Sequence, residues 1–153
     1  MLFRSNLPAG QSDTVLVVRA AAVAPGQFRV GFPGFPITMI SIITPVLNGA
    51  KTIERTLKAL SVQKADFEHI VQDGGSTDGT QDIVRQYSRI YPVRLCDEKD
   101  TGHFDALQRG MTKARGDVLA WINADDFYHP WTLATVQRVL AEHRDVHWIT
   151  GIP

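Results

Sequence analysis

From residue 38 onward, short apolar runs alternate with amphipathic stretches, and this alternation constrains the fold more than any other feature. Five runs predict β-strands at residues 38–44, 67–72, 93–96, 118–122 and 146–150. The stretches between them carry apolar residues at helical spacing, at residues 51–62, 80–91, 104–114 and in a helix opened by Pro130. This order predicts a mainly parallel sheet with helices on both faces, in which Pro45 ends the first strand.

The first 37 residues differ from the rest of the chain. Proline and glycine occur densely among them, and the apolar patch at residues 15–18 does not extend into a convincing element. We expect residues 1–37 to form a poorly structured N-terminal extension and residues 38–153 to form one domain.

Charge and cysteine content narrow the function classes. The chain has 153 residues, of which 16 are basic and 16 acidic, so a nucleic-acid partner is not expected. One cysteine cannot form an internal disulfide, and no apolar run is long enough for a transmembrane segment. Polar residues near the N-terminus interrupt any signal peptide. We therefore expect a cytoplasmic protein, with peripheral contact to a membrane left open.

Polar residues follow each of the first four predicted strands. Parallel α/β sheets bind ligands at the carboxyl ends of their strands, so these segments are the candidate site. Three of the four contain acidic residues; the segments are 44–49, 73–80, 97–105 and 123–126.

Residues 73–80 mix glycines with short hydroxyl and carboxylate side chains. This composition suits a loop whose backbone approaches a ligand, and it equally suits a tight turn in which Thr77 or Asp78 caps the next helix. The segment matches neither the Walker phosphate loop nor the Gly-x-Gly-x-x-Gly dinucleotide pattern.

Two adjacent carboxylates, Asp125 and Asp126, follow the fourth predicted strand. They repel each other unless a cation or solvent relieves the repulsion, and carboxylate oxygens suit Mg²⁺ or Mn²⁺. The alternative is that Asp126 belongs to the turn before the helix opened by Pro130.

The remaining charged segment also has two interpretations. Asp105 opens a predicted helix, and Arg109 lies four residues later, where the two can form an ion pair. Alternatively, Arg109 or Lys113 faces an anionic ligand.

Histidine and tryptophan side chains supply weaker candidates. His103 and His129 lie in the strand-end loops, where they could touch a ligand, and Trp131 could form a platform for one. Trp121 and Trp148 are expected in the core.

Together, the four segments resemble those of the inverting family-2 glycosyltransferases of the GT-A fold. The resemblance runs from about residue 40 to 152, and it rests on Ser41-Ile-Ile-Thr-Pro-Val-Leu-Asn48, Gln72-Asp-Gly-Gly-Ser-Thr-Asp-Gly-Thr80, Glu98-Lys-Asp-Thr-Gly-His-Phe-Asp-Ala106 and Asn123-Ala-Asp-Asp126. It implies a Rossmann-like three-layer α/β sandwich. It also implies a hexosyltransferase that uses a nucleoside-diphosphate sugar, UDP-sugar by preference, with Mn²⁺ or Mg²⁺. The implied acceptor is a glycan or a lipid-linked molecule.

The resemblance also implies roles for individual residues. Thr44 and Pro45 would border the base and Asp73 would bind it, while Asp105 would lie near the sugar and Arg109 near the diphosphate. Asn123 stands where the family's Asp-x-Asp element has its first acid, which leaves ribose and metal contacts to Asp125 and Asp126. The implied nucleotide-sugar-binding residues are Thr44, Pro45, Asn48, Asp73, Gly75, Asp105, Arg109, Asn123 and Asp125, and the implied metal ligands are Asp125 and Asp126.

No residue of this chain matches the family's catalytic base, which comes after the last predicted strand. We therefore expect a C-terminally truncated domain that contains the donor-binding half of the family's architecture. Two other interpretations stay open. One is a nucleotide-sugar-binding module without transfer activity, or an inactive fragment that lacks the acceptor half and the catalytic base. The other is an α/β phospho-receiver or nucleotide-binding domain that uses its acids for Mg²⁺.

Overall fold

The structure is a computed structural model that describes residues 16–21, 29–30, 39–143 and 145–150. In chain order, the elements are β1 (Leu16–Ala21), β2 (Arg29–Val30), β3 (Ile40–Val46), α1 (Ile53–Ser61), β4 (Phe67–Asp73), α2 (Thr80–Tyr87), β5 (Val93–Asp97), α3 (His103–Thr112), β6 (Val118–Trp121), α4 (Thr132–Glu142) and β7 (Trp148–Thr150). The predicted α/β alternation is confirmed, with bounds that differ by a few residues.

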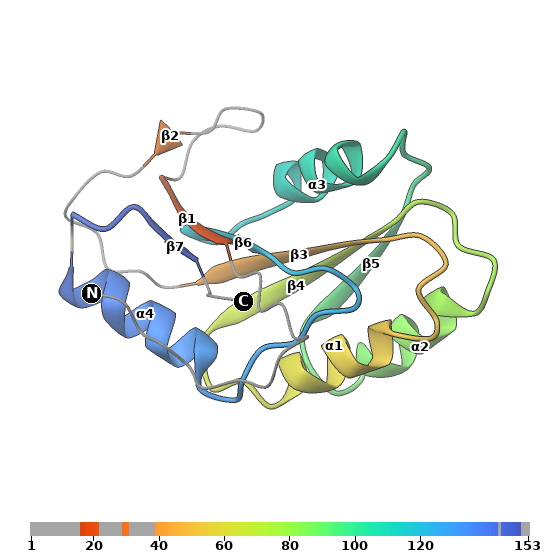
Figure 1. Ribbon diagram of the computed structural model, residues 1–153, viewed down its shortest axis with the longest axis horizontal. Helices are drawn as coiled ribbons and strands as arrows, with labels where there is room; N and C mark the ends of the chain where they lie inside the picture. The colour runs from red at the N-terminus through yellow and green to blue at the C-terminus, as the bar shows by residue number, and fades with distance from the viewer. Residues whose placement is uncertain (1–15, 22–28, 31–38, 144, 151–153) are drawn as a thin grey trace, which may run out of the picture.

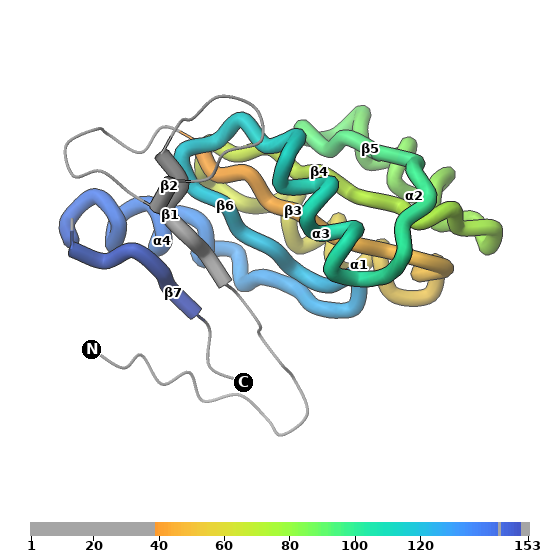
Figure 2. Tube along the Cα trace, turned by 90° about the horizontal axis from the view of Figure 1, so that it is seen from above, coloured from red at the N-terminus to blue at the C-terminus, as the bar shows by residue number. Residues whose placement is uncertain are grey.

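Four parallel strands form the centre of the sheet in the order β5-β4-β3-β6. Figure 2 shows these strands side by side beneath α3. β3 has β4 on one side and β6 on the other, which makes it the central strand of the parallel part. The predicted mainly parallel sheet is therefore confirmed.

β1 extends the sheet beyond β6, and the sequence pattern did not predict it. It pairs antiparallel with β6, and both β2 and β7 pair antiparallel with β1. The last predicted strand therefore exists as β7 but is separated from the parallel strands by β1. Most of the predicted extension, residues 1–37, lies outside the described residues, so the domain boundary stays a prediction.

Pro45 lies inside β3, so the prediction that it ends this strand was wrong. The Val46 carbonyl accepts from Gly74 N on the β4 side, which turns the position of Pro45 towards β6. The ladder with β6 has already ended there, since its last paired residue of β3 is Ile43. The N–H that proline lacks is therefore not needed by a neighbouring strand.

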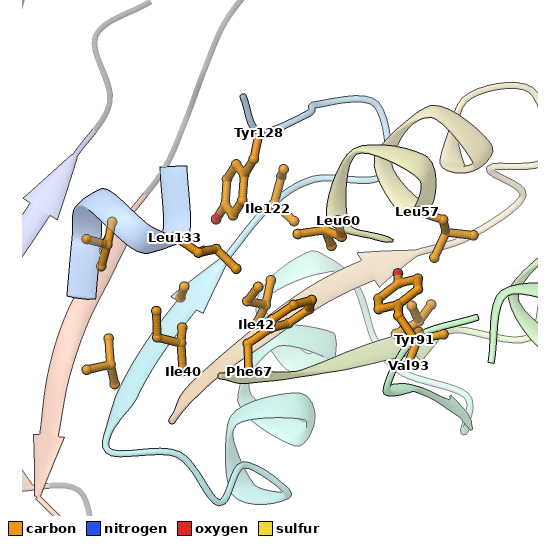
Figure 3. Packing of buried hydrophobic residues seen from close by; sticks show 14 of the residues in the cluster. Ile40, Ile42, Leu57, Leu60, Phe67, Tyr91, Val93, Ile122, Tyr128 and Leu133 are labelled. Carbon is orange, nitrogen blue, oxygen red and sulfur yellow. The ribbon is translucent and has the colours of Figure 1, made fainter. Parts of the chain in front are cut away.

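Helices cover both faces of the sheet. Figure 1 shows α3 on one face and α1, α2 and α4 on the other, so the architecture has three layers. The larger core lies under α1, α2 and α4, where Leu57, Leu60 and Leu133 pack against Ile42 and its neighbours (Figure 3). No helix in the described part of the chain is both long and apolar enough to cross a membrane.

The two tryptophans that were expected in the core differ. Trp121 is half-buried and packs beside the cluster under α3. Trp148 is 63% exposed on the three-residue strand β7, so that prediction was wrong.

On the opposite face, α3 lies close to β3 because one of its residues has no side chain. A Cβ added at Gly110 would lie 2.5 Å from Ile43 Cγ2, and Ile43 is fully buried. Ile43, Leu107 and Leu119 form the core of this layer. Glycine therefore sets how near α3 can approach the sheet.

We predict that Gly110→Ala destabilises the fold. Alanine favours the helix by up to about 1 kcal/mol, but overpacking a core typically costs about 1–3 kcal/mol. A net loss of about 1–2 kcal/mol in the free energy of urea unfolding is expected. Gln108→Ala on the exposed side of the same helix is the control, and a stabilised Gly110→Ala protein would contradict the packing described here.

A buried polar chain crosses the core between β3 and β4. His69 Nε2 lies 2.8 Å from Thr44 Oγ1, and His69 Nδ1 lies 2.8 Å from Tyr91 Oη. His69 is fully buried, and burial lowers its pKa from 6.5 to about 3. The imidazole is therefore neutral in the folded protein, and both its nitrogens have partners.

We predict that His69 makes stability fall in acid. The unfolded chain takes up a proton on His69 below pH 6.5, and the folded chain does so only near pH 3, so the contribution is complete above pH 6.5 and is lost as the pH falls. Between pH 6.5 and 4.5 the wild type should lose about 2–3 kcal/mol more unfolding free energy than His69→Gln. Urea titrations at both pH values measure this difference, and equal losses would refute it.

Candidate functional site

The candidate site lies at the edge of the sheet where β3, β4, β5 and β6 end. These strands are parallel, so the loops that follow them meet at this edge (Figure 1). The four polar segments singled out in the sequence occupy these loops. The structure therefore brings them together, as the strand order requires.

The loops after β3 and β4 are tied together by hydrogen bonds. Asn48 has a positive φ of 54° and receives the Thr77 N–H on its Oδ1 at 2.9 Å. Its own N–H donates to Ser76 Oγ at 2.7 Å. Asp78 accepts from the N–H of Thr80, the first residue of α2, and from the N–H of Ala50. The Thr80 hydroxyl also donates to Asp78. This hydrogen bond has the largest effect, and together with the two N–H bonds it lowers the pKa of Asp78.

Asp73, at the end of β4, is fully buried. Its Oδ1 accepts three hydrogen bonds, from the N–H groups of Gly75 and Ser76 and from Gln81 Nε2. Its Oδ2 is buried and has no hydrogen-bond partner among the described residues. An acceptor atom of this kind is costly to leave unpaired, which makes Oδ2 a strong candidate for contact with a ligand donor.

The glycines after Asp73 let the loop after β5 approach closely. A Cβ on Gly74 would lie 2.8 Å from Asp100 Oδ2, so the Asp100 carboxylate occupies the space beside this glycine. Gly75 has a φ of 100°, a conformation that residues with side chains rarely adopt. The sequence marked Asp100 only as part of a charged loop, and nothing in the chain order signals its contact with Gly74.

The charges around α3 are largely paired within the protein. Asp105 accepts from Thr101 N and Oγ1 and from Arg109 Nε at 3.0 Å. The Arg109 hydrogen bond is the main reason that the Asp105 pKa is lowered. Lys113 Nζ donates to Glu98 Oε2 and to Gln72 Oε1, each at 2.8 Å. The predicted Asp105–Arg109 ion pair is therefore present.

The turn after β6 carries the remaining candidates. Asn123 Nδ2 donates to Asp126 Oδ2 at 3.1 Å, and Asp126 N donates back to the Asn123 carbonyl at 3.2 Å. Asp126 thus lies in the turn, as the alternative interpretation expected. Asn123 Oδ1 is buried without a hydrogen-bond partner among the described residues, and Asp125 is exposed.

The oxygen atoms of this turn fit a hard divalent cation only in part. Among the described residues, no group of three histidine, cysteine or acidic side chains could hold a metal ion. The unpaired Asn123 Oδ1 and the exposed Asp125 carboxylate are oxygen ligands of the type that Mg²⁺ and Mn²⁺ accept. A metal bound by so few protein ligands completes its shell with water and ligand phosphates.

Thr44 and Pro45 lie below the surface of the site. Both are buried in β3, and the Thr44 hydroxyl is bonded to His69. They support the loop that contains Asn48 rather than facing solvent themselves.

The aromatic candidates form a separate row. The rings of His129 and Trp131 are stacked with centroids 4.9 Å apart, and Phe127 meets His129 edge to face. His103, at the start of α3, contacts the Phe104 ring.

Comparison with known proteins gives a consistent result. The family model described as "Glycosyl transferase family 2" matches residues 41–152. A PGL/p-HBAD biosynthesis glycosyltransferase of Mycobacterium tuberculosis (strain ATCC 25177 / H37Ra) is 38% identical over 117 residues, which are 74% of this chain and 46% of the relative. A validoxylamine A glucosyltransferase of Streptomyces hygroscopicus subsp. jinggangensis is 34% identical and covers 70% of this chain and 26% of its own length.

Solved structures resemble the fold as well. S. aureus TarS 1–349 in complex with UDP-GlcNAc superposes with a TM-score of 0.66 at 26% identity, over 69% of this chain and 32% of TarS. Glucosyl-3-phosphoglycerate synthase from Mycobacterium tuberculosis, with Mn²⁺, UDP and its product, has a TM-score of 0.57 at 27% identity, over 68% of this chain and 40% of the synthase. The chain spans about half the length of the mycobacterial relatives that it matches.

Proposed function

The chain belongs to glycosyl transferase family 2, and from this premise we propose that it binds the sugar donor of a metal-assisted glycosyl transfer. The observation that carries the proposal is that Asp73 Oδ2 and Asn123 Oδ1, at one edge of the sheet, are both buried and have no hydrogen-bond partner in the part of the chain that the structure describes. Asp73 Oδ2 would accept a hydrogen bond from the base, and Asn123 Oδ1 would lie beside the diphosphate of the donor.

A UDP-sugar is the donor that we propose. TarS is described in complex with UDP-GlcNAc, and glucosyl-3-phosphoglycerate synthase with UDP and Mn²⁺. A mannosyltransferase from Pyrobaculum calidifontis with a TM-score of 0.61 is described with GDP-Man and Mn²⁺, so a guanine donor is the competing outcome. The proposed acceptor is a glycan or a lipid-linked molecule, reached in the cytoplasm or at a membrane surface.

The site residues have distinct proposed tasks. Asp73 Oδ2 would accept from the base imide, and the loops that contain Asn48 and Gly75 would enclose the nucleoside. Asp125 and Asn123 Oδ1 would hold Mn²⁺ or Mg²⁺, and Asp126 would keep the Asn123 amide oriented through its hydrogen bond.

Asp105 and Arg109 would act at the other end of the donor. The Arg109 guanidinium would donate to the diphosphate, while the Asp105 carboxylate would accept a hydrogen bond from a sugar hydroxyl. Because the two now bond each other, a donor has to share or displace that hydrogen bond.

Bond cleavage leaves a nucleoside diphosphate, on which negative charge builds up. A divalent cation bound there would neutralise that charge. The protein would contribute by excluding water around Asp73 and by aligning the diphosphate with Asp125 and Arg109. A carboxylate base would remove the acceptor proton.

We predict that Asp125→Ala removes metal-dependent nucleotide binding. Calorimetry should show UDP binding to the wild type that weakens strongly when EDTA replaces Mn²⁺. Loss of a metal ligand should weaken Mn²⁺-dependent binding by at least about tenfold. Asp82→Ala, which removes an exposed carboxylate from α2, is the control and should bind as the wild type does. UDP binding to the wild type that is equally strong with Mn²⁺ and with EDTA would contradict the proposal.

We predict that Asp73→Asn weakens binding of the base and leaves binding of the diphosphate unchanged. The amide cannot replace the carboxylate both as the acceptor of three protein donors and as the acceptor for a base, so UDP should bind about tenfold more weakly. Binding of pyrophosphate with Mn²⁺ should stay unchanged, because pyrophosphate has no base. Equal weakening of UDP binding and pyrophosphate binding would assign Asp73 a purely structural role.

An assay for sugar transfer or sugar hydrolysis distinguishes an enzyme from a module that only binds the nucleotide sugar.

A further inference from the structure

Two residues of α1 hold the turn after β6, which contains Asn123, Asp125 and Asp126. Thr56 Oγ1 donates to the Asp126 carbonyl at 2.6 Å, and Arg55 Nη2 donates to the Asp125 carbonyl. Seventy residues of chain separate each donor from its acceptor. Two neighbouring carbonyls of the turn are therefore held by two neighbouring residues of one helix.

The two bonds differ in character. Thr56 is fully buried, so water cannot replace its hydroxyl, whereas Arg55 is exposed. The Arg55 guanidinium lies over the ring of Phe127, with its carbon 4.8 Å from the ring centroid. This contact restrains a long side chain that would otherwise move freely.

Holding a carbonyl fixes the orientation of its peptide unit, and with it the direction of the adjacent side chain. The carbonyl bonds from α1 act on the peptide units that follow Asp125 and Asp126. The bonds between Asn123 and Asp126 complete the turn. The Asp125 carboxylate and Asn123 Oδ1 therefore take their directions from α1 as well as from their own strand.

Gln63, two residues after the end of α1, contacts the chain beyond the turn, where it bonds no proposed metal ligand. Gln63 Nε2 donates to the His129 carbonyl at 2.7 Å, and Gln63 Oε1 accepts from Leu133 N at 3.1 Å. These bonds anchor the segment that leads into α4. Gln63 therefore holds the segment before α4, whereas Thr56 holds the turn that contains Asn123 and Asp125.

We propose that Thr56 and Arg55 are positioning residues that aim the metal-binding oxygens of the Asn123–Asp126 turn. The inference rests on the proposed function, because it assigns a metal to that turn. Groups that orient metal ligands from behind typically change metal affinity by about 10–100-fold when they are removed. Thr56 should have the larger effect, because its bond is shielded from water.

The first test compares Thr56→Val with Thr56→Ser. Valine keeps the shape and loses the donor, whereas serine keeps the donor. Thr56→Val should weaken Mn²⁺-dependent UDP binding about tenfold, and metal-free UDP binding should stay unchanged. Thr56→Ser should stay within about threefold of the wild type, because a hydroxyl can restore the bond. Arg55→Met should weaken binding less than Thr56→Val.

Ser61→Ala is the matched control on the same helix. Ser61 Oγ donates to the Lys58 carbonyl at 2.8 Å, a hydroxyl-to-carbonyl bond that touches no part of the turn. Its loss should leave metal-dependent binding unchanged. Thermal unfolding of each variant checks that the protein is folded at the temperature of the binding experiment.

Mn²⁺ alone supplies the second readout, which does not depend on a nucleotide. Paramagnetic broadening of the Ala124–Asp126 amide signals should occur in the wild type and Thr56→Ser, and should decrease in Thr56→Val. If broadening follows this order but UDP does not bind, the proposed function fails and the inference stands. If Mn²⁺ leaves the wild-type turn unaffected, if folded Thr56→Val matches the wild type, or if Thr56→Val and Thr56→Ser weaken alike, the inference is overturned.

Discussion

Parallel pairing of β3 with β4 and with β6 is the constraint on which the rest of the structure depends. Because β3 is hydrogen-bonded on both sides, its direction fixes the direction of its neighbours. The ends of all these strands, and the polar loops that follow them, are thereby placed at one edge. Both faces of β3 are covered by helices: Ile42 lies in the core under α1, α2 and α4, and Ile43 lies in the core under α3.

Periodicity in the sequence predicted the helices and the strands β3 to β6 because each depends on local apolar spacing. Asp73 and Asn123 could be predicted as candidate site residues for a related reason: they lie at the ends of apolar strands, and parallel strands end together. The Asp105–Arg109 pair was predictable because four residues make one helical turn. These features depend on short stretches of chain.

Features that depend on distant parts of the chain could not be predicted. β1 lies between β6 and β7, and it pairs with residues about 100 positions away in β6 and about 130 positions away in β7. Its hydrophobic patch is too short to show either partner. The Thr56 bond to the turn and the approach of Asp100 to Gly74 have no sequence signal either. Pro45 was misjudged because proline usually ends a strand, and only the sheet order shows that its missing N–H faces no partner.

The unpartnered oxygens of Asp73 and Asn123 have an energetic consequence for the unliganded protein. Each atom is buried from bulk solvent, and a buried acceptor that lacks a partner typically costs about 1–3 kcal/mol. A ligand that donates to these atoms, or coordinates them, regains an interaction without a further desolvation penalty on the protein side. Affinity for such a ligand and stability of the fold without it therefore depend in opposite directions on the same two atoms.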